Sequence, residues 1–385
     1  MRRAGEDLRV LVSAGAEKQS LAAVRSLGQA GAHVDVIDSR PDAPAFRSRH
    51  CRLGLVSPSN RDRDAYVRFL LERLRAVSYT TVLACDDLTA AYLSEERQSF
   101  AACTRLALPP PDSFRRATDK SALVRFAAAL GIPVPRSLEP RSTAEAAEQA
   151  DLLGFPIVVK GAHGWGAQHV RFVGRRQDFA ALFAEVARLE SPLGGGLPML
   201  QEFVRGSGYG FSTLFRAGEV RALFMHRRTA EFDVERRRTP YSCPVAESVH
   251  DDELRRLGLR LFEALRWHGL GMAEWRRETA TGRFVLMEIN PRLVGSTDLA
   301  MRAGVDLPLL ACRMLRDGDV RPVLDYRDGV RLRWLLPDGL LHFLARPAEA
   351  LRPRHLVTAT DWRWRDLEPH WMQLRRTAWQ LRHGH

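Results

Sequence analysis

Lysine is almost missing from this sequence, which has 385 residues and 58 basic side chains but only three lysines, Lys18, Lys120 and Lys160. A lysine ammonium is a compact point charge that can sit on a single anionic oxygen, whereas an arginine guanidinium is a planar fork. Retention of Lys120 and Lys160 in a chain that otherwise uses arginine indicates either chance survival or a tightly held anionic ligand. The residues that follow Lys160 favour the ligand.

Cysteines are also few, and their positions argue against two common kinds of site. None of the five belongs to a Cys-x-x-Cys pair, which argues against a zinc site and against a disulfide framework. No apolar run approaches the roughly 18 residues that a membrane span needs, and the first residues lack the apolar core of a signal peptide. We therefore expect free thiols, a cytoplasmic protein and no membrane partner. The cysteines are Cys51, Cys85, Cys103, Cys243 and Cys312.

A concentrated basic region is absent as well. The net charge is +12, but the arginines are spread along the chain among 46 acidic residues, and no basic tail occurs. Because nucleic-acid binding needs a basic face or stripe, we expect no nucleic-acid partner, and a general preference for arginine codons explains the charge more simply. A hydrophobic content of 45% and a length of 385 residues indicate about two to three domains with substantial cores.

The N-terminal part of the chain has the alternation of a parallel α/β sheet. Three short β-branched runs, separated by helical patterns, predict its strands. The Gly-x-Gly-x-x-Gly spacing of a dinucleotide site is absent from Ser13–Lys18, so no such site is assigned there. Asp86 and Asp87 follow the third run, where they either face a ligand cleft or cap a helix. The runs are 8–12, 33–37 and 81–85.

A glycine-rich segment begins at Lys160. Residues 155–160 form an apolar run that predicts a strand, and Gly161, Gly164 and Gly166 follow directly. Glycines let backbone amides approach a phosphate group closely, and Lys160 would contact the same group. The lysine precedes the glycines, so the segment is not a P-loop. An ordinary hairpin turn remains the alternative interpretation.

A second segment, Arg283–Thr297, carries two hard oxygen ligands. Alternate residues of a strand share a face, so Glu288 and Asn290 project together with Cα atoms about 7 Å apart. Magnesium is usually held by one or two carboxylates together with phosphates and waters. The pair therefore suits a metal–nucleotide complex, and the alternative is a solvated carboxylate at the end of a strand.

An upstream strand at 270–277 predicts a third metal ligand. If the connecting loop pairs Glu278 with Phe284, Glu274 falls directly opposite Glu288 in the hairpin. Both carboxylates would then face one point, together with the neighbouring amide.

The last part of the chain, residues 319–385, is rich in tryptophan. It holds five of the eight tryptophans, which predicts packing against the rest of the protein and argues against disorder. These are Trp334, Trp362, Trp364, Trp371 and Trp379.

Five elements in a fixed order resemble the ATP-grasp superfamily, and in particular its branch near carbamoyl-phosphate synthase large chains and carboxylate–amine ligases. The resemblance covers about residues 8–318 and depends most on both lysines and on the Glu-x-Asn-Pro-Arg sequence. The elements are Asp119–Lys120, Val159–Lys160 with its glycines, Gln201–Val204, Glu274, and Glu288–Arg292.

The resemblance implies an α/β and α+β chain with the ATP-grasp fold. An N-terminal parallel α/β domain (the pre-ATP-grasp domain) would be followed by a lid subdomain, a metal and substrate subdomain, and a small tryptophan-rich C-terminal extension. ATP would lie between the lid and the metal subdomain. The implied ranges are 1–108, 109–198, 199–318 and 319–385.

The resemblance also implies how the nucleotide is held. Lys120 and Lys160 would contact the phosphates of ATP. The adenine would pair with the backbone of Glu202, Phe203 and Val204.

The same resemblance places magnesium, with manganese as an alternative, on Glu274, Glu288 and Asn290. Arg292, just after the metal strand, would support the phosphoryl group during transfer.

The acceptor implied by the resemblance is a small-molecule carboxylate. Its acyl phosphate would be attacked by a small-molecule amine, giving an amide, ADP and phosphate. Because an arginine fork matches planar anions, Arg292, Arg227 and Arg228 are the candidates for holding the carboxylate. Ser296 and Thr297 precede a predicted helix and either receive a substrate carboxylate or cap that helix.

Two other classes of function share the same nucleotide site. One is an ATP-dependent phosphotransferase or acyl-phosphate former without an amine step, and the other is a non-catalytic nucleotide-binding regulator. No general base is evident in the sequence. The oligomeric state is open, with a homodimer among the expectations.

Overall fold

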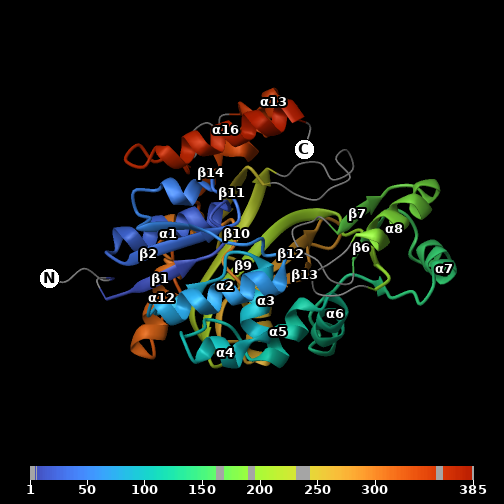
Figure 1. Ribbon diagram of the computed structural model, residues 1–385. Coiled ribbons are helices and arrows are strands. Elements are labelled where there is room, and N and C mark those ends of the chain that lie inside the picture. Colours follow the sequence, from blue (N-terminus) through green and yellow to red (C-terminus); the bar gives the residue numbers. More distant parts are fainter. Residues whose placement is uncertain are drawn as a thin grey trace.

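The computed structural model describes residues 5, 7–161, 169–189, 196–230, 243–352 and 359–383. These residues form three sheets with helices packed against them (Figure 1). A sheet from the N-terminal part of the chain and a larger central sheet lie together, and a small sheet projects to one side. None of the helices within these ranges has the length and apolar character needed to cross a bilayer.

The N-terminal sheet is parallel, which confirms the prediction from the alternating apolar runs. Its strand order is β3-β2-β1-β4. Val10 and Val12 of β1 share a core with helix α1, whereas Leu11 belongs to a second core with α2. This division follows from the alternation of side chains along a strand. The elements are β1 (Arg9–Val12), α1 (Lys18–Gln29), β2 (His33–Asp38), η1 (Pro44–Arg47), β3 (Leu53–Val56), α2 (Arg63–Ala76), β4 (Thr81–Leu83), α3 (Asp87–Glu95) and α4 (Arg97–Ala101).

The small sheet, which we call the lid sheet, is antiparallel with the order β5-β8-β6-β7 and has a separate hydrophobic core. Helix α6 begins at Lys120 because the Asp119 carboxylate accepts a hydrogen bond from the backbone N–H of Ala122 at 2.8 Å. The predicted end of the lid subdomain at residue 198 falls just before β8. Strand β8 nevertheless pairs with β5 and β6 and so belongs to the lid sheet. The elements are α5 (Pro111–Thr118), α6 (Lys120–Ala129), β5 (Ser137–Leu138), α7 (Thr143–Leu153), β6 (Ile157–Lys160), β7 (Val170–Val173), η2 (Arg176–Asp178), α8 (Phe179–Arg188) and β8 (Met199–Glu202).

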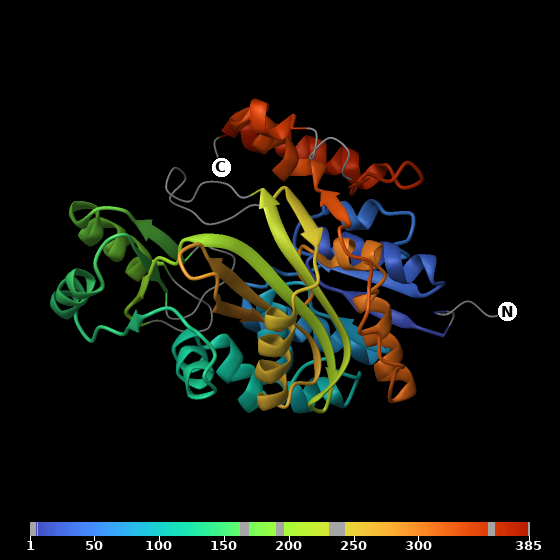
Figure 2. The ribbon, with the colours of Figure 1, turned by 180° about the vertical axis from the view of Figure 1, so that it is seen from behind.

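The central sheet has seven strands in the order β13-β12-β9-β10-β11-β14-β15. Helices α10 and α12 pack against its long strands, as the view from behind shows (Figure 2). The hydrophobic core of this sheet is continuous with one face of the N-terminal sheet. The elements are β9 (Gly206–Arg216), β10 (Glu219–Ala230), β11 (Val245–Ser248), α10 (Asp252–Ala264), β12 (Gly269–Glu278), β13 (Phe284–Asn290), α11 (Thr297–Ala303), α12 (Leu307–Asp317), β14 (Arg331–Arg333) and β15 (Ala359–Thr360).

The hairpin of β12 and β13 places Glu274 opposite Glu288, but not through the expected register. Phe284 pairs with Arg277, one residue earlier than predicted. A bulge directly after Glu274 compensates for this difference and restores the facing pair. The predicted outcome is therefore correct, although the register assumed for the loop is wrong.

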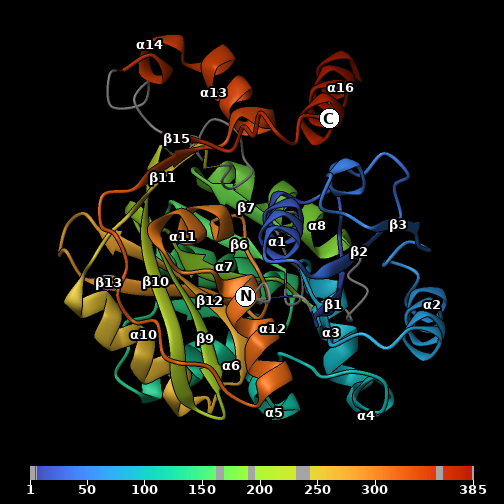
Figure 3. The ribbon, with the colours of Figure 1, turned by 90° about the vertical axis from the view of Figure 1, so that its left-hand side faces the viewer.

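The C-terminal extension is tied into the molecule at two places (Figure 3). Strand β14 pairs with β11 of the central sheet, and β15 pairs with β14. Farther along the chain, Arg25 of α1 donates to Asp366 at 2.7 Å and to the carbonyl oxygen of Asp361 at 3.2 Å. The extension therefore contacts both the central sheet and the N-terminal domain. Its helices are η3 (Leu335–Gly339), α13 (Leu340–Ala345), α14 (Pro347–Ala350) and α16 (Glu368–His383).

The tryptophans of the extension only partly follow the prediction that they pack. Trp334 is buried, with 4% of its surface exposed, but Trp364, Trp371 and Trp379 are 79%, 62% and 51% exposed. The prediction is wrong for these three. The extension is held largely through polar and ionic contacts, so most of its aromatic rings are not needed as core.

Removal of the Asp366 carboxylate should destabilise the protein strongly. Arg25 and Asp366 have side chains that are only 7% and 5% exposed. The variant Asp366→Ala leaves the guanidinium buried without its partner, and we expect a loss of about 3–5 kcal/mol in the free energy of unfolding. Urea denaturation followed by circular dichroism measures this. The control is Asp325→Ala, since that side chain is 97% exposed. A loss as small as that of the control would contradict the structural role of the pair.

Candidate functional site

Two of the three lysines meet at the end of β6. Lys160 is the last residue of that strand and is 7% exposed, and Lys120 is the first residue of α6. The Lys120 ammonium donates to the carbonyl oxygen of Gly161 at 3.2 Å. Gly161 directly follows Lys160, so its hydrogen bond brings the Lys120 ammonium to the end of the strand that carries Lys160.

Burial shifts the titration of both ammonium groups. It lowers the pKa of Lys160 to about 8, against the opposing charges of Glu288 and Glu274 and with the help of the Lys120 charge. Burial also lowers the pKa of Lys120, and the charges of Glu288 and Asp87 oppose that shift. Buried cations of this kind are costly unless an anion compensates them. The two lysines therefore mark a place prepared for an anion.

The acidic residues of the β12–β13 hairpin lie close enough to Lys160 for their charges to act on its ammonium group. Glu274 on β12 faces Glu288 on β13, and the Asn290 amide nitrogen lies 3.4 Å from Oε1 of Glu288. Arg228 of β10 donates to Oε2 of Glu274 at 2.8 Å. Burial raises the pKa of Glu274, Arg228 opposes this shift, and the charge of Glu288 adds to it. The two carboxylates thus repel each other in a buried setting.

This donor set fits a magnesium ion that arrives with phosphate. Within the described ranges, no three His, Cys, Asp or Glu side chains form a cluster that could hold a metal by themselves. Glu274, Glu288 and Asn290 offer two carboxylates and one amide, the usual protein share of a magnesium–nucleotide site. A divalent cation would also relieve the repulsion between the carboxylates.

Arg292 lies beside these ligands and is engaged by the N-terminal domain. Its Nε and Nη2 atoms each donate to an oxygen of Asp87 at 2.7 Å, and Nη2 also donates to Oδ1 of Asn290 at 3.1 Å. Asp86 caps α3 by accepting from the backbone N–H of Thr89 at 2.8 Å. Of the two acidic residues, one is a helix cap, and the other fixes the arginine next to the metal strand.

Arg227 is not brought into this cluster. Neighbouring residues of a strand project to opposite faces, and Arg228 is the one that points toward Glu274. Arg227 instead donates to Glu247 at 2.8 Å. The structure thus places Arg227 with Glu247 and not with Glu274, and its role in holding a substrate carboxylate stays a prediction.

The two hydroxyl residues before α11 differ in their surroundings. Thr297 is 1% exposed, and its hydroxyl donates to the carbonyl oxygen of Val294 at 2.6 Å, so it is used within the protein. Ser296 is 8% exposed, lines the cavity described below and makes no side-chain capping bond. Of the two, Ser296 lines the cavity, and the substrate contact of either residue stays a prediction.

The predicted adenine-binding residues follow β8. Glu202 is joined to Arg136, whose carbonyl oxygen accepts from the Glu202 backbone and whose N–H donates to the Glu202 carboxylate, both at 2.9 Å. The Phe203 ring meets Phe172 edge-on, with centroids 4.9 Å apart. The backbone N–H of Val204 donates to none of the described residues. That N–H can pair with a base.

The predicted phosphate loop is only partly described. Gly164 and Gly166 lie outside the described residues. The Gly161 amide donates to the carbonyl oxygen of His169 at 2.7 Å, so this amide is used within the protein. The Gly161 contribution to the site is its carbonyl oxygen, which receives Lys120.

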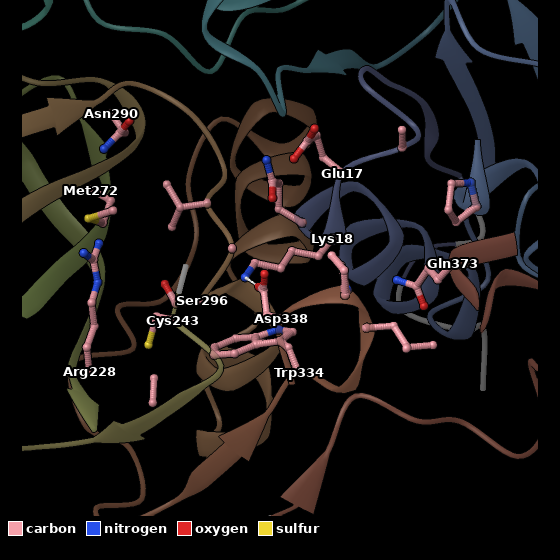
Figure 4. A pocket seen from close by; sticks show the side chains of 18 of the residues that line it. Glu17, Lys18, Arg228, Cys243, Met272, Asn290, Ser296, Trp334, Asp338 and Gln373 are labelled. Atoms are coloured by element: carbon pink, nitrogen blue, oxygen red, sulfur yellow. Dashed lines mark hydrogen bonds and ion pairs between the residues drawn. The ribbon is translucent and has the colours of Figure 1, made fainter. Parts of the chain in front are cut away.

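A cavity of about 440 Å³ adjoins Glu274 and Asn290, two of the predicted metal ligands (Figure 4). Arg228, Glu274 and Asn290 line one side of it, and Lys18 and Trp334 line another. Lys18 was not among the predicted site residues. The rarity of lysine in this chain was the available signal, because Lys18 lines the cavity that Glu274 and Asn290 also line.

Two family models match separate parts of the chain. One, described as "ATP-grasp in the biosynthetic pathway with Ter operon", matches residues 223–336, which include the predicted metal ligands. The other, described as "Carbamoyl-phosphate synthase L chain, ATP binding domain", matches residues 119–206, which include Lys120 and Lys160.

Curated relatives are similar over parts of their length. The D-alanine–D-alanine ligase of Chromohalobacter salexigens is 30% identical over 211 residues, covering 51% of this chain and 64% of the relative. Acetyl-CoA carboxylase of Saccharomyces cerevisiae is 27% identical over 170 residues, covering 42% and 7%. The methylcrotonoyl-CoA carboxylase alpha subunit of Glycine max is 22% identical over 283 residues, covering 67% and 39%. The chain thus spans less than two thirds of each of these proteins.

Solved structures with a similar fold include three at low sequence identity. The biotin carboxylase domain dimer of Hydrogenobacter thermophilus 2-oxoglutarate carboxylase, in complex with MgADP, ADP and bicarbonate, has a TM-score of 0.67 at 15% identity, covering 84% of this chain and 73% of the other. N5-carboxyaminoimidazole synthetase from Staphylococcus aureus has a TM-score of 0.65 at 13% identity, covering 90% and 86%. L-amino acid ligase from Bacillus licheniformis has a TM-score of 0.63 at 16% identity, covering 83% and 78%.

At these identities the structural similarity concerns the fold, and the family matches supply the relationship in sequence. The fold has the expected mixed α/β architecture, with a parallel N-terminal sheet. The two family matches fall on the segment with the buried lysines and on the segment with the facing acids. Two segments of the chain therefore match ATP-grasp family models, and the chain has the fold of ATP-grasp enzymes.

Proposed function

We propose that this protein is an ATP-dependent carboxylate–amine ligase that forms an amide bond through an acyl phosphate and releases ADP and phosphate. One observation carries the proposal. The buried Lys160 and the half-buried Lys120 lie near the facing carboxylates Glu274 and Glu288, and a cavity large enough for a small acid adjoins Glu274. Its substrates are a small-molecule carboxylate and a small-molecule amine.

The residues divide into a phosphate side and a metal side. Lys120 and Lys160 neutralise the charge of the phosphate oxygens. Each ammonium group is compact enough to contact one phosphate oxygen. Glu274, Glu288 and Asn290 hold magnesium, or manganese, which prefers similar oxygen ligands. When bound, the metal polarises a phosphoryl oxygen as a Lewis acid.

The arginines have distinct roles in this proposal. Arg228 lines the cavity beside Glu274, and its planar fork matches the carboxylate of the acid substrate. Arg292 holds the Asn290 amide and the N-terminal domain together through Asp87, which makes it a positioning residue. The acid is activated when its carboxylate oxygen attacks the γ-phosphorus and ADP leaves. The amine then displaces phosphate from the acyl carbon.

A screen of ADP release over pairs of carboxylates and amines tests the proposal. A ligase releases ADP in proportion to amide only when acid and amine are both present. ADP release with the acid alone would indicate an acyl-phosphate former or phosphotransferase. Binding of ATP without release of ADP across the screen would indicate a nucleotide-binding regulator. Hydroxylamine converts an acyl phosphate, but not a phosphate ester, into a hydroxamate, so trapping separates an acyl-phosphate former from a phosphotransferase within the second outcome.

Nucleotide affinity should fall as pH rises through the pKa of Lys160. That pKa is about 8, lowered by burial, so the ammonium is charged below pH 8 and increasingly neutral above it. If binding requires the charged form, the Kd of a non-hydrolysable ATP analogue should rise by up to about tenfold per pH unit above this value. Isothermal titration calorimetry measures it. The variant Lys160→Met should lose this pH dependence, and an unchanged profile in that variant would contradict the assignment.

A homodimer is a further part of the proposal. It rests on the similar Hydrogenobacter thermophilus structure, which is a dimer of biotin carboxylase domains. Light scattering coupled to size-exclusion chromatography measures the mass, and a monomer at all protein concentrations would contradict the dimer.

A further inference from the structure

The cavity beside the metal ligands is built from three distant parts of the chain. The start of α1 contributes Lys18, the central sheet contributes Arg228 and Asn290, and the C-terminal extension contributes Trp334 and Asp338. Figure 4 shows Lys18, Asp338 and Trp334 gathered together, with Arg228 and Asn290 on the opposite side of the pocket. One end of the cavity thus adjoins the site of phosphoryl transfer, and the other end belongs to the extension.

Lys18 is held firmly at the far end. Its ammonium donates to Oδ2 of Asp338 at 2.9 Å and lies 4.5 Å from the centre of the Trp334 ring. A Cβ atom added at Gly295 would lie 2.4 Å from Cε of Lys18, so the end of the lysine side chain lies directly against this glycine. An ion pair, an aromatic ring and a glycine from the metal segment therefore fix this side chain.

The ion pair is not closed off from the cavity. The Lys18 and Asp338 side chains are 32% and 16% exposed, and both line the pocket. Burial lowers the pKa of Lys18, but the charge and hydrogen bond of Asp338 outweigh it and raise the pKa above its ordinary value. The Lys18 ammonium therefore stays protonated at neutral pH. The far end therefore presents an ammonium and a carboxylate side by side, over the face of an indole.

A cation and an anion placed together on a cavity wall suit a ligand that is itself a zwitterion. Asp338 can accept from an ammonium group of the ligand, while Lys18, which lies over the Trp334 ring, holds the Asp338 carboxylate in place. At the near end, Arg228 and Ser296 face the cavity, and the acid to be activated needs its carboxylate there. The end of the cavity at Arg228 therefore suits the carboxylate of a ligand, and the end at Asp338 suits its ammonium group.

We propose that the acid substrate of this enzyme is an amino acid, whose carboxylate lies toward Arg228 and whose ammonium is received by Asp338 above Trp334. This inference rests on the proposed ligase function and adds its substrate class. Lys18 is a positioning residue that orients the Asp338 carboxylate. The C-terminal extension is accordingly a wall of the substrate site, and residues 335–338 determine specificity.

Calorimetric titration with the twenty protein amino acids tests this, using the full chain with magnesium and a non-hydrolysable ATP analogue. Each amino acid that binds is compared with the deamino acid of the same skeleton, such as propionate for alanine. We expect at least one amino acid to bind, and its deamino acid to bind about 10- to 100-fold more weakly, because a charged hydrogen bond is lost. Equal affinity for both acids, or no binding by any amino acid, would overturn the proposal.

The variant Asp338→Asn should bind the two acids of such a pair with nearly equal affinity. Asp325→Asn is the matched control, because it makes the same change on a side chain that is 97% exposed. If Asp338→Asn does not fold, Lys18→Gln serves instead. It keeps the Asp338 carboxylate, so it should still prefer the amino acid while binding it more weakly. Retained preference in Asp338→Asn, or lost preference in Lys18→Gln, would contradict the assignment.

These outcomes are separate from failure of the ligase function. ADP release with simple carboxylic acids and an amine, together with equal binding of both kinds of acid, would keep the ligase and remove the amino acid. Preferential binding of an amino acid without ADP release for any pair would keep the site and remove the ligase.

Discussion

Replacement of Glu288 by alanine should lower kcat for ATP turnover by about 10³-fold, the largest effect that we expect from a single substitution. Glu288 faces Glu274, lies next to Asn290 and acts electrostatically on Lys120 and Lys160. Loss of this ligand removes metal stabilisation of transition-state charge, which is worth several kcal/mol, and each 1.36 kcal/mol is a factor of ten. Steady-state ADP release at saturating magnesium measures the change.

The more conservative Glu288→Gln separates charge from shape, and it should be nearly as inactive because a neutral amide binds magnesium poorly. Glu219→Ala is the control, since that carboxylate is 72% exposed at the start of β10. Circular dichroism should show a folded protein in each case. Turnover of Glu288→Ala within a factor of a few of the unmodified enzyme would exclude Glu288 as a metal ligand.

Replacement of Lys160 should have the second largest effect, on nucleotide affinity. Lys160→Met removes a buried cation from the place where both lysines converge. The loss of hydrogen bonds to a charged group costs about 1.5–3 kcal/mol, so the Kd of a non-hydrolysable ATP analogue should rise by about 10- to 150-fold. Calorimetric titration at neutral pH measures this.

Lys160→Arg tests whether shape matters as well as charge. The planar fork is larger than an ammonium and cannot occupy the same buried position over a single oxygen, so we expect weaker binding although the charge is kept. Arg175→Met is the matched control in the same region, because that side chain is 68% exposed. Affinity of Lys160→Arg equal to that of the unmodified protein would remove the reason for a lysine at this position.

The site residues differ in how far local sequence could predict them. Glu288 and Asn290 could be paired because residues two apart on one strand share a face. Glu274 was placed correctly only because a bulge compensated for a register that is one residue off. The sequence could not show which of Arg227 and Arg228 faces the acidic residues. Neighbouring residues of a strand face opposite ways, and how β10 pairs in the central sheet decides that Arg228 meets Glu274 while Arg227 meets Glu247.

The residues that the sequence did not predict are those whose partners lie far away along the chain. Asp87 and Arg292 are 205 positions apart, and Lys18 and Asp338 are 320 apart. No spacing rule connects such pairs. Trp364 and Trp371 were expected to pack but are exposed. The number of tryptophans in a segment does not show which of them other parts of the chain cover.

The sequence by itself determined the strand–helix alternation of the N-terminal sheet, the cap at Asp119 and the shared face of Glu288 and Asn290. These depend on backbone periodicity and on hydrogen bonds between near neighbours, which act over a few residues. The tertiary structure alone decided which arginine meets Glu274, what holds Arg292, and that the third lysine and the C-terminal extension form the far wall of the cavity. Those contacts arise when separately formed elements pack together, so their partners are set by topology and shape complementarity across hundreds of residues.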